Sequence, residues 1–165
     1  FDGYWKDVGT ISSLWEANME VLDPENSGIN IFDDNWRIYS RNSGMTGHRV
    51  GETAELDNCM ITDGCSIEGK VKHSILFAGV KVEKGAEIED AVIMGGSTIK
   101  EGAKVKHCII AENVVIEKDA VVGVMPEGDE KGVATVGSGV VVGEGAVIGP
   151  KAIVSEDVKG GDKVW

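Results

Sequence analysis

Cysteine, proline and aromatic residues are scarce in this chain of 165 residues, which has three cysteines, three prolines and 5% aromatic residues. The cysteines show no paired spacing, which argues against a zinc site or a disulfide framework. No apolar run is long enough for a membrane-spanning helix. Basic residues are also scarce, and the net charge of -12 argues against nucleic acid and anionic membranes as partners. We expect a protein of the reducing cytoplasm.

An aliphatic repeat fills the middle of the chain. From Val50 to Val122, aliphatic residues recur at steps of four to six positions, and most sets of three consecutive steps sum to 17. Neither the period of a helix nor the strict alternation of a half-exposed strand gives this spacing. A fixed internal period of this length predicts a parallel β-helix built from hexapeptide repeats, with three faces to each coil.

Four aligned segments test this register. They begin at Leu56, Val71, Ile88 and Val105, so the first place always holds a large aliphatic residue. The residues at the fourth place are all small, and they are Cys59, Ser74, Ala91 and Cys108. A large and a small column fit a narrow prism whose coils stack about 4.8 Å apart. Two of the three cysteines then lie inside the core, so disulfides are not expected.

Residues 1–44 lack the repeat and contain three of the four tryptophans. We expect them to be the end of a preceding domain plus a linker, with the β-helix domain over residues 45–165. A short strand is predicted over Asp2–Thr10. A helix should follow, with Ser13 and Glu16 as its capping box and a stop at Pro24. Its apolar stripe consists of Ile11, Trp15, Met19 and Leu22. This segment is too small to close a core, so we infer a C-terminal fragment of a larger protein.

The repeat is interrupted after Val122. Residues 124–133 are charged and contain proline and glycine, which predicts a loop that projects from the β-helix. The repeat resumes at Val136 and predicts one more full coil. The tail from Lys159 onward is expected to be a cap or a frayed end.

Polar residues occupy the third place of the aligned segments, and they are Asn58, His73, Asp90 and His107. We expect an outward ladder. Histidine and aspartate at this spacing could hold a metal or move protons, but a surface ladder with weak ion pairing is the favoured interpretation. Hexapeptide-repeat acyltransferases use a histidine as general base, and His48, His73 and His107 are the only candidates for that role.

Asp7 is a second candidate site. It follows the predicted strand and precedes Gly9 and a capped helix. A carboxylate there could hold a hard cation such as Mg²⁺, which usually takes only one or two carboxylates from the protein. It could equally cap a turn. The spacing alone leaves both interpretations open.

A family resemblance bears on this choice. The first part of the chain closely resembles the last strand and following helix of the catalytic domain in bacterial glucose-1-phosphate adenylyltransferases. In that family an α/β nucleotidyltransferase domain precedes a left-handed parallel β-helix, which is the fold that the resemblance implies here. The residues that carry it are Gly3-Tyr4-Trp5-Lys6-Asp7-Val8-Gly9-Thr10-Ile11, Leu14-Trp15-Glu16-Ala17-Asn18-Met19 and Trp36-Arg37-Ile38-Tyr39.

The resemblance implies that Asp7 is one of two aspartates that hold the catalytic Mg²⁺. The implied reaction is attack of glucose 1-phosphate on the α-phosphorus of ATP, which gives ADP-glucose and pyrophosphate. The family's second metal aspartate, its glycine-rich nucleotide loop and its sugar-phosphate lysine do not occur in these 165 residues. We therefore expect the chain alone to be inactive and to act as a regulatory and assembly domain.

The family also implies partners. Its members are homotetramers controlled by anionic metabolites that bind between the two domains. Arg37, Arg41, His48 and Arg49 are the concentrated positive group at the junction, so we hypothesise that they form part of an effector site, against the alternative of solvated linker charges. Two other functions remain open: a hexapeptide-repeat acyltransferase, and a purely structural oligomerisation domain.

Overall fold

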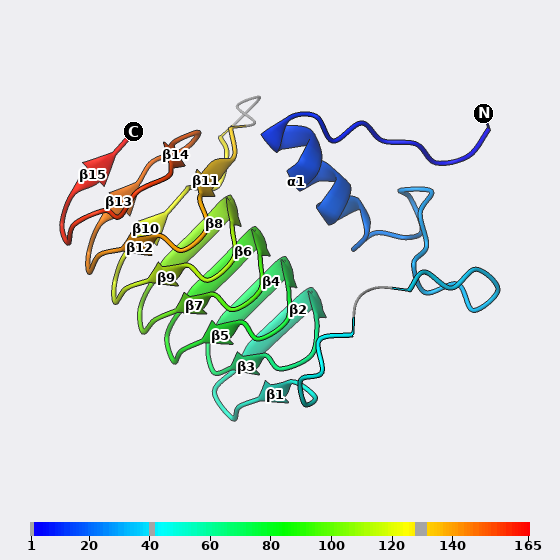
Figure 1. The fold of residues 1–165 in the computed structure, drawn as a ribbon, viewed down its shortest axis with the longest axis horizontal. Helices are drawn as coiled ribbons and strands as arrows, with labels where there is room; N and C mark the ends of the chain where they lie inside the picture. The colour runs from blue at the N-terminus through cyan, green and yellow to red at the C-terminus, as the bar shows by residue number, and fades with distance from the viewer. Residues whose placement is uncertain (1, 40–41, 128–131) are drawn as a thin grey trace.

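The computed structural model describes residues 2–39, 42–127 and 132–165. One helix, α1 (Ile11–Glu20), precedes a stack of short parallel strands (Figure 1). The strands in chain order are β1 (Arg49–Val50), β2 (Glu55–Ile61), β3 (Ser66–Ile67), β4 (Lys70–Leu76), β5 (Lys81–Val82), β6 (Glu87–Ile93), β7 (Thr98–Ile99), β8 (Lys104–Ile110), β9 (Val115–Ile116), β10 (Val121–Val122), β11 (Ala134–Val136), β12 (Val141–Val142), β13 (Val147–Ile148), β14 (Ile153–Val154) and β15 (Lys163–Val164).

The strands stack into the three faces of a left-handed parallel β-helix, as the repeat and the resemblance predicted. The first face is the sheet β1-β3-β5-β7-β9-β12. The long strands β2, β4, β6 and β8 supply the other two faces. The first half of β8 pairs with β10, which continues to β13 and β15, whereas its second half pairs with β11, which continues to β14. Each long strand therefore passes around a corner.

A left-handed residue makes that corner. The third-place residues Asn58, His73, Asp90 and His107 have φ between 42° and 52°, a conformation that non-glycine residues rarely adopt. The predicted ladder is therefore real, but it runs along an edge of the prism rather than across an extended face. Asparagine and aspartate tolerate this conformation best among non-glycine residues, and the packing must hold the two histidines in it.

The core consists of the columns that the sequence predicted. Large side chains such as Ile67, Leu76, Ile93 and Ile99 have no exposed surface. The small column lies just after the corner, where Cys59 pairs with Ser74 and Ala91 pairs with Cys108. Ser74 is fully buried, and its hydroxyl accepts a hydrogen bond from the backbone N–H of Ala91 at 3.0 Å. All three cysteines are free thiols, as expected, and burial raises the pKa of Cys108.

The helix α1 covers one outer face of the β-helix (Figure 1). The fifth place of the aligned segments points outward there, and it holds Met60, Ile75, Val92 and Ile109. The predicted apolar stripe of α1 packs on these residues, and Met19 is only 6% exposed. The segment that could not close a core by itself thus shares one with the β-helix.

Two predictions for this segment are wrong. The N-cap is Thr10 rather than Ser13: the hydroxyl of Thr10 accepts from Ser13 N, and the hydroxyl of Ser13 accepts from Thr10 N. Threonine and serine are both good N-cap residues. Thr10 takes the role here because its own backbone is extended, as an N-cap requires. The predicted strand over Asp2–Thr10 is also absent, because this segment contacts α1 through side chains and pairs with no strand in the described parts of the chain.

The C-terminal end is more regular than predicted. After the interruption, β11 to β15 continue the stack beyond one coil, and Lys163 pairs with Val147 of β13, so the tail is not frayed. Residues 124–127 and 132–133 lie outside strands, as expected for the predicted loop 124–133, whose residues 128–131 lie outside the described residues. Within the described parts of the chain, no helix has the length and apolar character needed to span a bilayer.

Because Ile93 points into the core and Ile153 points outward, their replacement by alanine should change the free energy of unfolding by very different amounts. Ile93 has no exposed surface, whereas Ile153 is 66% exposed. Ile93→Ala should lower the free energy of unfolding by about 2–5 kcal/mol, because it opens a cavity that neighbouring coils cannot fill. Ile153→Ala, the matched control, should change it by about 0.5 kcal/mol or less. Urea denaturation followed by circular dichroism measures both, and equal losses would contradict the assignment.

Candidate functional site

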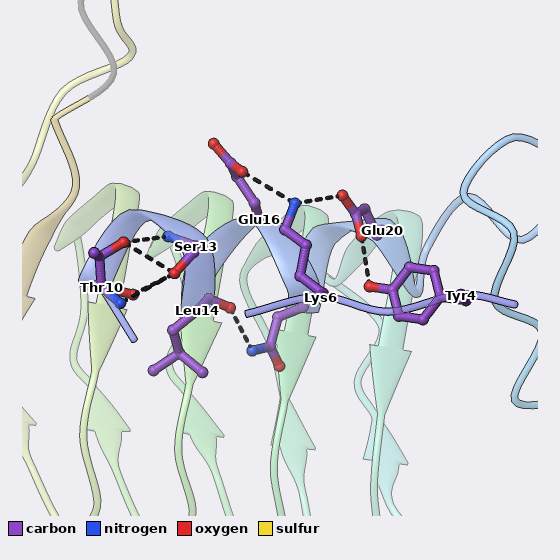
Figure 2. A network of polar contacts seen from close by, with 8 residues as sticks. Tyr4, Lys6, Thr10, Ser13, Leu14, Glu16 and Glu20 are labelled. Atoms are coloured by element: carbon purple, nitrogen blue, oxygen red, sulfur yellow. Dashed lines mark hydrogen bonds and ion pairs between the residues drawn. The ribbon is translucent and has the colours of Figure 1, made fainter. Parts of the chain in front are cut away.

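The segment before α1 is held against the helix by a polar network (Figure 2). The hydroxyl of Tyr4 donates to Glu20 Oε2 at 2.6 Å. The ammonium of Lys6 donates to Glu16 Oε2 at 3.1 Å and to Glu20 Oε1 at 2.7 Å. Because Glu16 and Glu20 are one helical turn apart, both face the same side of α1. The segment therefore runs back along the helix and enters it through a fixed turn.

The network also changes the acidity of its members. The hydrogen bond from Lys6, followed by the one from Tyr4, lowers the pKa of Glu20. The hydrogen bond to Glu20 raises the pKa of Tyr4 and, together with the contact to Glu16, that of Lys6. Each shift favours the charge state that keeps the network intact, so the network persists at neutral pH.

Asp7 lies at the turn between this segment and the helix. Its Oδ1 accepts a hydrogen bond from the backbone N–H of Gly9 at 2.9 Å, and its side chain is exposed. A Cβ on residue 9 would lie 3.1 Å from that same oxygen, so a larger residue there would press on the Asp7 carboxylate. Oδ1 of Asp7 therefore caps the turn. Oδ2 of Asp7 makes no hydrogen bond within the described parts of the chain.

Asp7 fits the protein's share of a Mg²⁺ site, because Mg²⁺ commonly takes a single carboxylate and draws its other ligands from phosphates and water. It does not form a complete site by itself. Among residues 2–39, 42–127 and 132–165, no group of three or more His, Cys, Asp or Glu side chains is arranged to hold a metal ion. The corner ladder therefore does not provide the alternative metal site.

The predicted effector residues have separate partners. Arg37 contacts Asp34 at 3.4 Å, and Arg49 contacts Glu68 at 2.6 Å. His48 is exposed, and Arg41 lies outside the described residues. The described contacts thus do not join these four residues into one site. Arg37 also lines a shallow pocket with Phe32 and Tyr39, which gives it an aromatic surrounding that the sequence did not indicate.

The corner ladder divides into a histidine–aspartate contact and a buried ring. His73 Nδ1 lies 2.6 Å from Asp90 Oδ1. His107 is 4% exposed and packs against Trp15 of α1, with 4.4 Å between the ring centroids. The indole N–H of Trp15 donates to the backbone oxygen of Asp90 at 2.8 Å. The helix therefore covers the His107 end of the expected surface ladder, whereas Asn58 at the other end is exposed, and this contact joins α1 to the corner.

Charged side chains alternate on the face formed by the first halves of the long strands. One column reads Glu55, Lys70, Glu87 and Lys104, and its neighbour reads Asp57, Lys72, Glu89 and Lys106. Ion pairs follow the columns, with Lys72 at 3.0 Å from Glu89 and Lys70 at 3.0 Å from Glu55. A shallow pocket of about 360 Å³ lies on this face. Opposite charges on adjacent coils stabilise the stacking register.

Sequence reasoning missed the Tyr4–Lys6–Glu20 network and the docking of Trp15. The apolar fifth column, Met60, Ile75, Val92 and Ile109, was a usable signal, because an outer sheet face with that character must be covered. No pattern predicted the pairing of Lys6 with Glu16 and Glu20, since it depends on how the segment folds back.

These features define a class of protein: a hexapeptide-repeat β-helix with a helix docked on one face. The chain belongs to the GlmU-like, C-terminal hexapeptide family, whose model matches residues 42–143. It is 49% identical over 123 residues to proteins named glucose-1-phosphate adenylyltransferase from Bacillus mycoides (strain KBAB4) and Bacillus cereus (strain ATCC 10987 / NRS 248), and 48% identical to one from Bacillus anthracis.

Each of these matches covers 74% of this chain but only 29% of the relative. The chain therefore spans about a third of the length of the curated relatives it matches. The resemblance to glucose-1-phosphate adenylyltransferases that the sequence predicted is confirmed.

The polar network predicts a change in the titration of Tyr4. Glu20→Gln removes the carboxylate that raises the pKa of Tyr4, so that pKa should fall towards its ordinary value near 10.0. The chain has two tyrosines, so the titration is followed by phenolate absorbance in a Tyr39→Phe background. Glu25→Gln, on the exposed turn after α1, is the control and should change nothing. An unchanged Tyr4 titration in Glu20→Gln would mean that the network does not exist in solution.

Proposed function

We propose that this chain is the C-terminal part of an enzyme that makes ADP-glucose and pyrophosphate from ATP and glucose 1-phosphate. The observation that carries the proposal is the Asp7 turn. It presents an exposed carboxylate with one oxygen fixed by Gly9 N, and it is anchored to α1 by Lys6 and Tyr4. The relatives named glucose-1-phosphate adenylyltransferase support the same activity for the longer protein.

In that enzyme Asp7 would be one of the residues that hold Mg²⁺. Bound Mg²⁺ neutralises developing charge on the phosphates and orients them. The contribution of this chain is positional. Gly9 N fixes the rotamer of Asp7, the capping box of Thr10 and Ser13 fixes the start of α1, and the packing of Met19 fixes the helix on the β-helix. A carboxylate held in this way pays less entropy when it binds a cation.

The β-helix would serve as the scaffold and assembly domain of this enzyme. Several large side chains near the N-terminal segment are exposed in this chain: Trp5 is 75% exposed, Val8 50% and Trp36 66%. Exposed apolar side chains mark a contact surface where they form a contiguous patch. We propose that the rest of the longer protein covers them, that the protein forms a homotetramer, and that it functions in the cytoplasm. A purely structural oligomerisation domain is the alternative, and it would leave Asp7 without a chemical role.

The acyltransferase alternative has less support. His107 is buried beneath Trp15, and the nitrogen of His73 that faces Asp90 is engaged at 2.6 Å. Three pockets outlined by the described residues have no histidine in their linings. A general base needs access to the hydroxyl or amine that it deprotonates, so neither ladder histidine has the surroundings that this chemistry requires.

An effector site at the junction is a further part of the proposal. Arg37 and Arg49 make exposed ion pairs, which are weak and can exchange their carboxylate partners for a phosphate. We propose that Arg37, Arg41, His48 and Arg49 contribute to binding of an anionic metabolite between this chain and the catalytic domain of the longer enzyme.

The role of Asp7 predicts a separation of activity from stability. In the longer enzyme, Asp7→Asn should lower ADP-glucose formation about 100-fold or more, because it removes the charge that holds the cation. The thermal midpoint should not change, because the amide oxygen can still accept from Gly9 N. Asp2→Asn, also exposed and five positions earlier, is the matched control and should keep full activity. The 165-residue chain alone should be inactive.

Activity of Asp7→Asn within a few-fold of wild type would leave Asp7 as a turn cap only. Synthesis of ADP-glucose by the 165-residue chain alone would contradict the proposal that the active site is shared with a missing domain.

The effector proposal predicts a loss of response without a loss of basal rate. In the longer enzyme, Arg37→Ala combined with Arg41→Ala should raise the half-maximal concentration of an activating sugar phosphate by about tenfold, which corresponds to about 1.4 kcal/mol of binding. Lys159→Ala, an exposed cation far along the chain, is the control. Steady-state assays across a panel of sugar phosphates and inorganic phosphate measure this, and an unchanged response in the double variant would remove the idea.

A further inference from the structure

His107 is a buried titratable group that the proposed function does not use. It stands at the corner of β8 with φ of 44° and 4% exposure. Within the described residues, neither of its ring nitrogens has a hydrogen-bond partner. A polar ring buried in this way is costly, because it gives up its bonds to water without replacing them. A phenylalanine ring could make the same apolar contacts without this cost, so packing does not account for an imidazole at this position.

The cover over His107 comes from the helix. The ring of Trp15 packs against the imidazole at 4.4 Å between centroids with a tilt of 57°. The same indole donates its N–H to the backbone of Asp90, one coil away. The rest of the interface is apolar, with Met19 against Ile75, Val92 and Ile109 in one cluster. Removal of α1 would therefore return His107 to solvent, since His107 lies on the outer corner and not in the core of the β-helix.

We propose that the Trp15–His107 contact makes the docking of α1 on the β-helix sensitive to pH, so that protonation of His107 releases the helix. The released state gives the imidazolium access to water, whereas in the docked state neither ring nitrogen has a hydrogen-bond partner among the described residues. This inference goes beyond the proposed function, because it needs only the helix, the β-helix and one proton.

The direction of the pH effect follows from the state, docked or released, in which His107 is more easily protonated. Burial lowers the pKa of His107, and the carboxylate of Asp90 opposes this only in part. A group whose pKa is lower in the docked state stabilises docking fully above its ordinary pKa of about 6.5. That stabilisation is lost as the pH falls from about 6.5 towards the lower pKa of the docked state.

The charged neighbours on each packed element do not reverse this direction. From β6 the carboxylate of Asp90 faces the ring, but it is already in contact with His73 of β4. On α1 the carboxylates are those of Glu16 and Glu20, and both are paired with Lys6.

The strands next to His107 add little negative charge. Its own strand β8 carries Lys104 and Lys106, of which Lys106 lies 3.8 Å from Glu89 of β6. The adjacent strand β11 contains only Ala134, Thr135 and Val136. Burial is therefore the cause that lowers the pKa of His107, and Asp90 is the charged neighbour that opposes it.

The consequence reaches the N-terminal segment. Release of α1 would also free the turn at Thr10 and Asp7, because Lys6 and Tyr4 fix that segment to the helix and not to the β-helix. Where Asp7 holds a cation, as proposed above, protonation of His107 would loosen its position from a distance. The docking measurement below does not depend on that role, so the two proposals can fail separately.

Amide hydrogen exchange of the 165-residue chain tests the inference. After correction for intrinsic exchange, the opening constant of residues 11–20 should rise as the pH falls below about 6.5, by at most about tenfold per pH unit, and should level off below the lower pKa of the docked state, while core amides of β4, β6 and β8 stay protected. His107→Phe keeps an aromatic ring against Trp15 and cannot titrate, so its opening constant should be independent of pH between 5 and 7.5. His48→Gln changes an exposed histidine outside the corner ladder and should keep the wild-type response.

Two direct readouts keep the test decisive if His107→Phe does not fold. The first is the fluorescence of Trp15 in a Trp5→Phe, Trp36→Phe, Trp165→Phe background, which should change as α1 leaves the corner; the three replaced indoles are 75%, 66% and 77% exposed. The second is an NMR titration of His107 in the wild-type chain. A pKa at or above about 6.5 for His107 would overturn the proposal. So would an opening constant of residues 11–20 that does not change with pH in the wild-type chain.

Discussion

The left-handed corner in each long strand is the constraint on which the rest of the structure depends. A β-strand alternates its side chains between two faces, but the positive φ of Asn58, His73, Asp90 and His107 interrupts this alternation. The residue after the corner then points into the prism, where only a small side chain fits, as Ser74 and Ala91 show. The next residue points outward again. One backbone conformation, repeated on four coils, therefore sets the inner column, the outer column and the edge between two faces.

The outer column determines where the helix lies. Because Ile75, Val92 and Ile109 repeat at the same place, they form an apolar strip along the stack, and an amphipathic helix can lie across several coils at once. The helix in turn determines the turn that carries Asp7, since the capping box begins at Thr10 and the polar network returns along α1. The site therefore depends on the coils through two steps of packing.

The sequence predicted the coils well because their signal is local and repeated. The large first column and the small fourth column, with Cys59 and Cys108, indicated the register correctly. The resemblance around Asp7 indicated the family. The errors fall where the outcome depends on contacts across the chain. Thr10 and Ser13 are equally good caps locally, and the segment from Tyr4 to Lys6 reads as a strand until Glu16 and Glu20 provide partners for its side chains.

His107 was the least predictable residue, because its role changes with what covers it. The sequence repeat alone predicts that His107 is one more polar residue in an exposed ladder. Under Trp15 it becomes a buried imidazole whose two nitrogens have no partner within the described residues.

The strip that binds the helix is apolar and indifferent to pH, so hydrophobic packing alone would hold α1 equally at any acidity. A single imidazole at the edge of that strip is sufficient to change this, since each unit of difference in its pKa between the docked and released states alters the docking equilibrium tenfold. In this proposal the β-helix does more than support the turn at Asp7, because the corner that builds its coils also places the imidazole that couples that turn to protons.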